Sequence, residues 1–214
     1  IMGEGIRLER SQDLRGFGRE VRGWRDLIWP YGGHGPGMLF RDGTDEEEMT
    51  AVSLEHEAAI ILAAGGHLYY NAVRSERANY PRHALRYSEF IYDNTMVALL
   101  APASLVSFSP APKWLDWEAF ARLKFGPGER RRLILHLLTE PVSNNPFKDK
   151  TNKAAPVVTG QQLQWHLPEG ATASGAWLID ASPEPHHVAI PWTAGPTGLT
   201  LTLPPIRFWA TVVR

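Results

Sequence analysis

The first hundred residues alternate between helical apolar spacing and short apolar runs. From Ser11 to Trp29 the large apolar residues recur at steps of three and four, which predicts one face of an amphipathic helix. A second helix is predicted to begin at Thr44, since Glu47 completes a capping box with it. The full set is typical of an α/β repeat, with helices at 11–29, 44–64 and 82–100 and short strands at 38–40 and 67–70.

The pattern changes after Pro102, where short alternating or apolar runs follow one another with Pro, Gly or Asn between most of them. About seven strands in roughly 110 residues are typical of an antiparallel sandwich. A long segment at 139–156 is expected to cover a sheet edge. The predicted strands lie at 104–108, 131–138, 161–167, 175–180, 186–190, 199–203 and 206–213.

The first part is too short to close a barrel of its own. A complete (β/α)8 barrel takes about 250 residues, and two or three parallel strands alone would leave open apolar edges. We therefore predict an α/β part followed by an all-β part: residues 1–101 as the C-terminal portion of a (β/α)8 (TIM) barrel, and 102–214 as an antiparallel β-sandwich. A small independent α/β domain is the alternative. Trp114 and Trp117 are candidate anchors between the two parts.

Composition removes several classes of function. Hydrophobic residues make up 43% of the 214 and charged residues 21%, which favours a packed core over disorder. The net charge of -1 gives no reason to expect a nucleic-acid or membrane partner. Without cysteine there are no disulfides, thiol catalysis or Cys-based zinc sites, and the histidines lack metal-ligand spacing. We expect no metal and no cofactor, and the compartment stays open, with a secreted or cell-surface protein as one option.

The beginning of the chain has an unusual pattern. Ile1-Met2-Gly3-Glu4 lacks the regions of a signal peptide and has the pattern of the end of a buried strand running into a glycine-flanked carboxylate. We therefore expect a fragment that needs a missing N-terminal part of the barrel as its partner. The active sites of (β/α)8 enzymes lie at the C-terminal ends of strands, and Glu4 would act there as a general acid if burial raised its pKa. The alternative is an exposed glutamate.

Two further segments contain candidate substrate-binding residues. His67 follows Gly65-Gly66, a pair that lets the backbone approach a ligand, and Tyr69 offers a stacking face. The alternatives are a buried histidine and a core tyrosine. The loop before Gly37 suits carbohydrate binding or an ordinary connection with a buried Trp, and its candidate residues are Trp29, Tyr31 and His34. In a barrel these groups converge, with Glu4 and His67 within about 10–12 Å of each other, two strand spacings of about 4.8 Å plus side-chain reach.

Several segments together resemble glycoside hydrolase family 66, which contains dextranases and cycloisomaltooligosaccharide glucanotransferases. In that family an apolar helix ends in a Gly-Gly-x-His-type turn, followed by a Tyr/Phe-Pro-x-His segment and a helix ending in Tyr-Asp/Glu-Asn. A His-Leu strand, a Ser-Pro-Asp segment and a closing strand with Trp follow. The corresponding segments here are 60–68, 79–85, 87–94, 135–139, 177–184 and 206–209.

The resemblance implies a retaining glycoside hydrolase or transglycosylase that acts on an α-glucan-like polysaccharide. It assigns the acid/base role to Glu4 at the end of the sixth barrel strand, and places the nucleophilic Asp before residue 1. This chain departs from the family at Gly5-Ile6, where a Trp is usual near the Glu, and at Tyr69, where a Glu is frequent. A carbohydrate substrate is the expected partner. The alternative from another class is a non-catalytic carbohydrate-binding or structural module.

Overall fold

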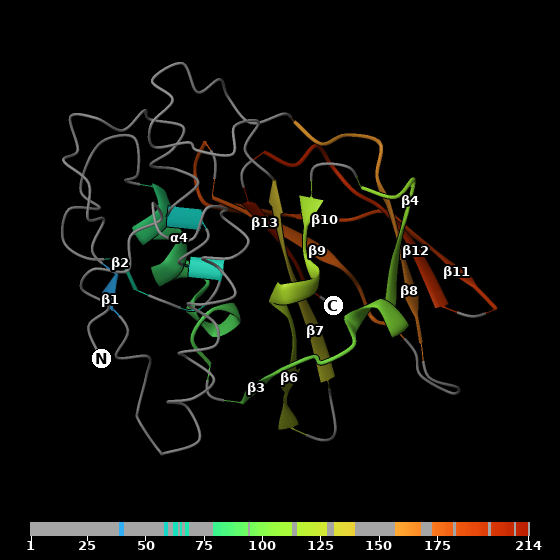
Figure 1. Ribbon diagram of the computed structural model, residues 1–214, viewed down its shortest axis with the longest axis horizontal. Helices are drawn as coiled ribbons and strands as arrows, with labels where there is room; N and C mark the ends of the chain where they lie inside the picture. Colours follow the sequence, from blue (N-terminus) through green and yellow to red (C-terminus); the bar gives the residue numbers. More distant parts are fainter. Residues whose placement is uncertain are drawn as a thin grey trace.

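A computed structural model describes part of the chain, and eleven of the thirteen described strands form two antiparallel sheets packed face to face (Figure 1). A helical part covers the other face of the larger sheet, so three layers follow one another from left to right in Figure 1. The described residues are 39–40, 58–59, 62–63, 65, 67–68, 79–93, 95–112, 115–127, 131–139, 157–167, 173–181, 183–196, 198–207 and 209–213.

The larger sheet, called the large sheet below, has the strand order β10-β9-β13-β7-β6-β3, with β5 also paired to β7. All its pairings are antiparallel. Its strands are β3 (Met96–Ala98), β5 (Leu115–Asp116), β6 (Ala121–Phe125), β7 (Arg131–Thr139), β9 (Trp177–Asp180), β10 (His186–Ala189) and β13 (Trp209–Val213).

The second sheet, called the small sheet, has the order β11-β12-β8-β4 and is also antiparallel throughout. Its strands are β4 (Val106–Ser109), β8 (Gln162–His166), β11 (Trp192–Gly195) and β12 (Gly198–Thr202), and short 3-10 turns occur at Ser88–Phe90, Pro102–Ser104 and Glu118–Phe120. The core between the sheets takes alternate residues of the strands β7, β8, β12 and β13, as the period of two requires. It includes Leu133, Leu135 and Leu137 of β7, and Leu163, Trp165, Leu199 and Leu201 of the small sheet.

The central strands of the large sheet are buried on both faces. Residues 133–139 of β7 and all five residues of β13 are buried. Helix α4 (Asn79–Arg86) lies against the outer face and buries Tyr80, His83 and Ala84. Burial from both sides explains why β7 contains a continuous apolar run rather than a strict alternation.

The first part of the chain contributes a parallel pair of short strands, β1 (Leu39–Phe40) and β2 (His67–Leu68). Residues 58–59 and 62–63, between these strands, are helical, and all four are buried. Parallel strands connected through a helix are the unit of an α/β repeat. The barrel proposed for residues 1–101, and the division at residue 101, stay predictions.

The β-content after Pro102 is confirmed, since each of the seven predicted runs contains a strand. The helix predicted over 82–100 is wrong in its second half, where β3 pairs with β6. A turn at Asp93 precedes this strand, because its Oδ1 accepts hydrogen bonds from the Thr95 amide (2.8 Å) and hydroxyl (2.6 Å). Trp117 packs in the core between the two sheets, 5.2 Å from the Phe108 ring, and Trp114 lies outside the described residues.

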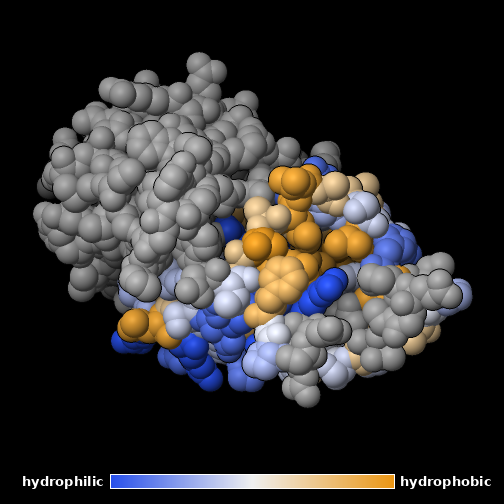
Figure 2. Space-filling model, turned by 90° about the horizontal axis from the view of Figure 1, so that it is seen from below, coloured by the Kyte–Doolittle hydropathy of each residue, from blue (hydrophilic) through white to orange (hydrophobic). Residues whose placement is uncertain are grey.

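Large apolar side chains are exposed near β3 and β6. Leu100 is 97% exposed, Val97 49% and Phe125 45%. Seen from below, the molecule shows hydrophobic residues gathered on the side where Figure 1 has the ends of these strands (Figure 2). Exposed apolar surface of this kind is typical of a contact with another protein segment.

Gly198 at the start of β12 is expected to be intolerant of a side chain. Its φ is +151°, and a Cβ would overlap the backbone carbonyl of Trp165. Gly198→Ala is therefore expected to lower the free energy of unfolding in urea by about 2–5 kcal/mol. The control is Gly195→Ala on the paired strand, where a Cβ meets only the Gly198 oxygen at 3.7 Å. It should cost less than about 1 kcal/mol, and equal losses for the two variants would contradict the prediction.

Candidate functional site

Of the site residues predicted from the sequence, only one lies within the part that the structure describes. His67 is the first residue of β2, where it pairs with Leu39 of β1. The other candidates lie outside the described residues: Glu4, Trp29, Tyr31, His34 and Tyr69. The expected separation of Glu4 and His67 therefore stays a prediction.

The turn before His67 is fixed from the large sheet. Arg122 of β6 is 2% exposed, and its guanidinium donates to the carbonyl oxygen of Ala63 over 3.0 Å. Gly65 has a φ of +81°, and its amide donates to the Leu62 carbonyl at 2.9 Å, as in a glycine-terminated helix. A cation is favourable at the negative end of a helix. The sandwich therefore contributes a residue that holds the segment leading into the predicted site.

A cluster of aromatic and imidazole rings lies between α4 and the large sheet, with the Trp209 indole at its centre. Trp209 is 1% exposed and stacks on Tyr80, with centroids 6.3 Å apart and planes 8° from parallel. The His83 ring lies 4.5 Å from Trp209 and the His136 ring 5.7 Å from it. Contacts of this kind contribute beyond their buried area, so the cluster fixes the helix on the sheet.

The hydrogen bonds of His136 indicate which of its ring nitrogens holds the proton. The Trp209 indole N–H donates to His136 Nδ1 at 3.3 Å, and Thr211 Oγ1 lies 2.9 Å from the same nitrogen. Because an indole nitrogen can only donate, Nδ1 is an acceptor here. His136 is therefore neutral in this arrangement, with its proton on Nε2.

His83 is also held in its neutral form. Burial lowers the pKa of His83 to about 4; a hydrogen bond to the Asp180 backbone acts in the opposite direction, and the charge of His186 lowers the pKa further. Its Nδ1 has no hydrogen-bond partner within the described part of the chain. The ring is 1% exposed, so it has no access to a substrate and serves packing rather than proton transfer.

Side-chain contacts also hold both ends of α4. Asn79 Nδ2 donates to the Pro183 carbonyl, and Arg86 donates to the Pro185 carbonyl at 2.8 Å. Just beyond the helix, the Tyr87 hydroxyl lies 3.1 Å from His187 Nδ1 on β10. These contacts join α4 to the segment that leads into the edge of the large sheet.

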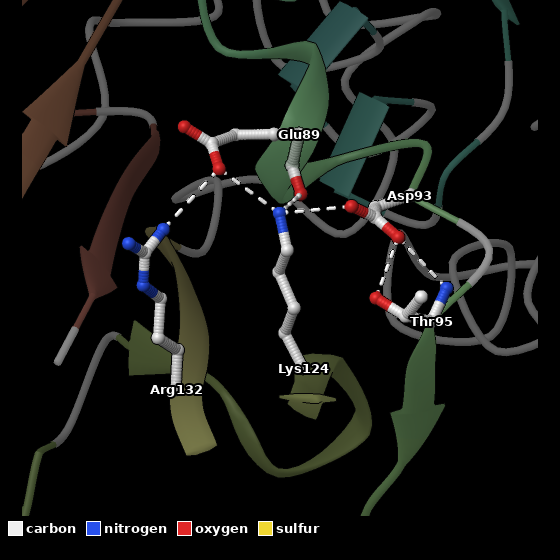
Figure 3. A network of polar contacts seen from close by, with 5 residues as sticks. All are labelled: Glu89, Asp93, Thr95, Lys124 and Arg132. Carbon is white, nitrogen blue, oxygen red and sulfur yellow. Dashed lines mark hydrogen bonds and ion pairs between the residues drawn. The ribbon is translucent and has the colours of Figure 1, made fainter. Parts of the chain in front are cut away.

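A charged network closes the other end of the interface, where Lys124 of β6 bridges two carboxylates (Figure 3). Its ammonium lies 2.9 Å from Glu89 and 2.8 Å from Asp93, and Arg132 also reaches Glu89 at 3.2 Å. Burial alone would raise the pKa of Asp93, but hydrogen bonds from Lys124 and Thr95 outweigh it, so the pKa lies below its ordinary value. Asp93 is therefore ionised at neutral pH.

These polar groups are arranged for structure rather than for chemistry on a ligand. They bond one another or backbone carbonyls, and the imidazoles of His83 and His136 are buried. Within the described residues no group of three or more histidines and carboxylates is close enough to hold a metal ion. No helix among the described residues has the length and apolar character needed to span a membrane.

Sequence reasoning did not identify the roles of Arg122, His83 and Trp209. The residues of β6 alternate between Ala121, Leu123 and Phe125 on one side and Arg122 and Lys124 on the other. That period of two predicts a strand. Two basic residues on one face of this strand were the sequence signal that could have indicated a buried polar interface.

The neutral state of His83 predicts a pH-dependent stability. A folded pKa of about 4 against an ordinary 6.5 means that its contribution is complete above pH 6.5 and is lost as the pH falls toward 4. The loss amounts to roughly 3 kcal/mol. In urea unfolding at pH 7 and pH 4.5, His83→Gln is expected to show a smaller fall in the free energy of unfolding than the parent. The same fall in both proteins would contradict this assignment.

The Lys124 network predicts unequal costs for its two cations. Lys124 is 12% exposed and makes two ion pairs, whereas Arg132 and Glu89 are 51% and 53% exposed. Lys124→Met is expected to lower the free energy of unfolding by about 1–2 kcal/mol, and Arg132→Met by less than about 0.5 kcal/mol. Thermal or urea unfolding measures both losses. Equal losses for the two variants would contradict the prediction that Lys124 contributes more to stability than Arg132.

Comparisons with solved structures show a likeness in fold to part of a larger enzyme. No protein-family model matches the chain, and no curated protein matches it. An α-L-fucosidase isoenzyme 2 from Paenibacillus thiaminolyticus aligns with a TM-score of 0.33 and 20% identity, over 53% of this chain and 16% of the fucosidase. A cycloisomaltooligosaccharide glucanotransferase from Paenibacillus sp., complexed with cycloisomaltoheptaose, aligns with a TM-score of 0.59 and 16% identity. That alignment covers 77% of this chain and 27% of the glucanotransferase chain, so the chain shares the fold of part of a glycoside-active enzyme.

Proposed function

We propose that this chain is part of a glycoside hydrolase or transglycosylase that acts on an α-glucan-like polysaccharide by a retaining mechanism. Glu4 is the acid/base in this proposal, and the nucleophilic carboxylate comes from outside these 214 residues. A retaining site needs two carboxylates about 5–5.5 Å apart. Substrate contacts are assigned to His67, Tyr69 and the loop residues Trp29, Tyr31 and His34.

The observation that carries the proposal is the likeness in fold to the glucanotransferase complexed with cycloisomaltoheptaose. It agrees with the independent resemblance of the sequence segments to family 66. Fold alone does not determine function. The proposed substrate class therefore rests on the sequence segments that resemble family 66 and on Glu4, and not on the structural alignment with the glucanotransferase.

The contact between Arg122 and the segment before His67 supports a shared role for the two parts of the chain. The guanidinium holds the Ala63 carbonyl, two residues before the Gly65 turn, and β2 begins at His67. A substrate-binding histidine needs a fixed backbone to keep its geometry. In the proposed enzyme the sandwich supplies that support from behind the barrel.

The second candidate function is a non-catalytic carbohydrate-binding or structural module. Most of the described residues belong to the two-sheet sandwich, which favours this reading over catalysis for that part of the chain. The two functions are separated by whether Glu4 is needed for turnover.

The test is Glu4→Gln in the complete protein, assayed for turnover of dextran and of short isomaltooligosaccharides. General acid/base catalysis contributes about 10²–10⁴-fold, so kcat is expected to fall by that factor. The loss should be smaller on an aryl glycoside, whose leaving group departs without protonation. Glu118→Gln, at an exposed position in the sandwich, is the matched control. Unchanged turnover in Glu4→Gln removes the catalytic assignment and leaves the binding module.

A further inference from the structure

The outer face of the small sheet is polar but uncharged. None of its four strands contains Asp, Glu, Lys or Arg, although 21% of the chain is charged. Along β8 and β12, buried apolar residues alternate with more exposed ones, so the second set faces outward. The outward side chains are hydroxyls, amides and one imidazole: Ser107, Ser109, Gln162, Gln164, His166, Thr193, Thr200 and Thr202.

Strand register places these side chains in rows. Thr193 pairs with Thr200, Thr200 with Gln164, and Gln164 with Ser107, so one row crosses all four strands. Directly opposed residues of antiparallel strands lie on the same face. With strands about 4.8 Å apart the row spans about 14 Å. A second row runs beside it through Thr202, Gln162 and Ser109.

Most donors and acceptors of the side chains in these rows face solvent. Gln162, Gln164 and Thr202 are exposed. Ser107 Oγ lies 3.5 Å from Gln164 Oε1 and 3.5 Å from His166 Nε2, at the outer limit of a hydrogen bond. Each hydroxyl both donates and accepts, and each amide offers two donors and an acceptor. The face therefore presents alternating donors and acceptors with no carboxylate, ammonium or guanidinium.

The lack of charge decides which ligand matches this face. A nucleic acid or an anionic polymer would require Lys or Arg, and the centre of a protein–protein contact would require apolar and aromatic residues. A neutral polyhydroxylated chain needs repeated donors and acceptors at a spacing near the length of a hexose unit, which the strand spacing offers.

We propose that the outer face of the small sheet is a second carbohydrate site, which binds a neutral glucan chain apart from the predicted catalytic face. The choice of a glucan rests on the proposed function, whereas the neutrality of the ligand rests on the side chains of this face. Such a site would hold a long polysaccharide beside the enzyme and would contribute little to reaction on a short one.

The experiment measures the retardation of the full chain in native gels that contain dextran. The variant combines Gln164→Glu, which adds a charge and removes the amide donors, with Thr200→Val, which removes a hydroxyl and retains a strand-favouring shape. Its affinity for dextran is expected to fall about tenfold or more. Ser174→Glu adds the same charge at an exposed position outside the small sheet and should leave the retardation unchanged. Gln162→Ala alone, expected to weaken binding about threefold to tenfold, serves if the double variant does not fold.

Three results would overturn the proposal. The first is equal retardation of the double variant and the parent, and the second is no retardation of the parent by dextran. The third is that the parent is a dimer and the double variant a monomer, because a second copy of the chain would then be the ligand of this face. The proposed catalytic function is tested separately by Glu4→Gln on short isomaltooligosaccharides. If Glu4→Gln loses turnover while the sheet variants keep the dextran retardation of the parent, only the second site is refuted. If Glu4→Gln keeps its turnover while the sheet variants lose dextran retardation, only the catalytic role is refuted.

Discussion

Burial of the central strands of the large sheet on both faces is the constraint on which the rest of the structure depends. Its central strands β7 and β13 supply Leu135 and Val212 to the core between the sheets, and His136 and Trp209 to the contact with α4. Each large apolar side chain buried there contributes roughly 1.5–3 kcal/mol. Removing either cover would expose one whole face of the same strands. The helical part and the sandwich are therefore two covers of one sheet.

Polar groups within the α4 interface fix how the helix lies on the sheet. An apolar interface alone is nondirectional, whereas the hydrogen bonds from Asn79 to the Pro183 carbonyl and from Arg86 to the Pro185 carbonyl each require one arrangement of α4. The buried Arg122 guanidinium bonds the Ala63 carbonyl, and a buried polar group left without its partner costs free energy, so alternative placements of the segment at residues 62–63 are disfavoured. By this route the sandwich holds the segment that enters β2.

Sequence reasoning succeeded where one strand contains its own signal. The run Leu133–Leu138 and the alternation Gln162–His166 both predicted strands that the structure contains. It failed where tertiary contacts decide: β3 lies in a segment with helical spacing but pairs with β6, and β11 is exposed throughout at a sheet edge. The polar row on the small sheet could not be predicted from the sequence for a related reason. Strand register brings together residues as far apart in the chain as Ser107 and Thr193. Of the predicted catalytic face, only the strand position of His67 is described.

Hydrogen exchange of the complete chain tests the shared sheet most directly. If α4 and the sandwich are two covers of one sheet, amides of α4 and of β13 should open with the same free energy, near that of global unfolding. Trp209→Leu should then lower the protection of both segments by the same amount. Opening of α4 at a much lower free energy, with β13 retaining full protection in Trp209→Leu, would show that the helix is an independent attachment and would contradict the account.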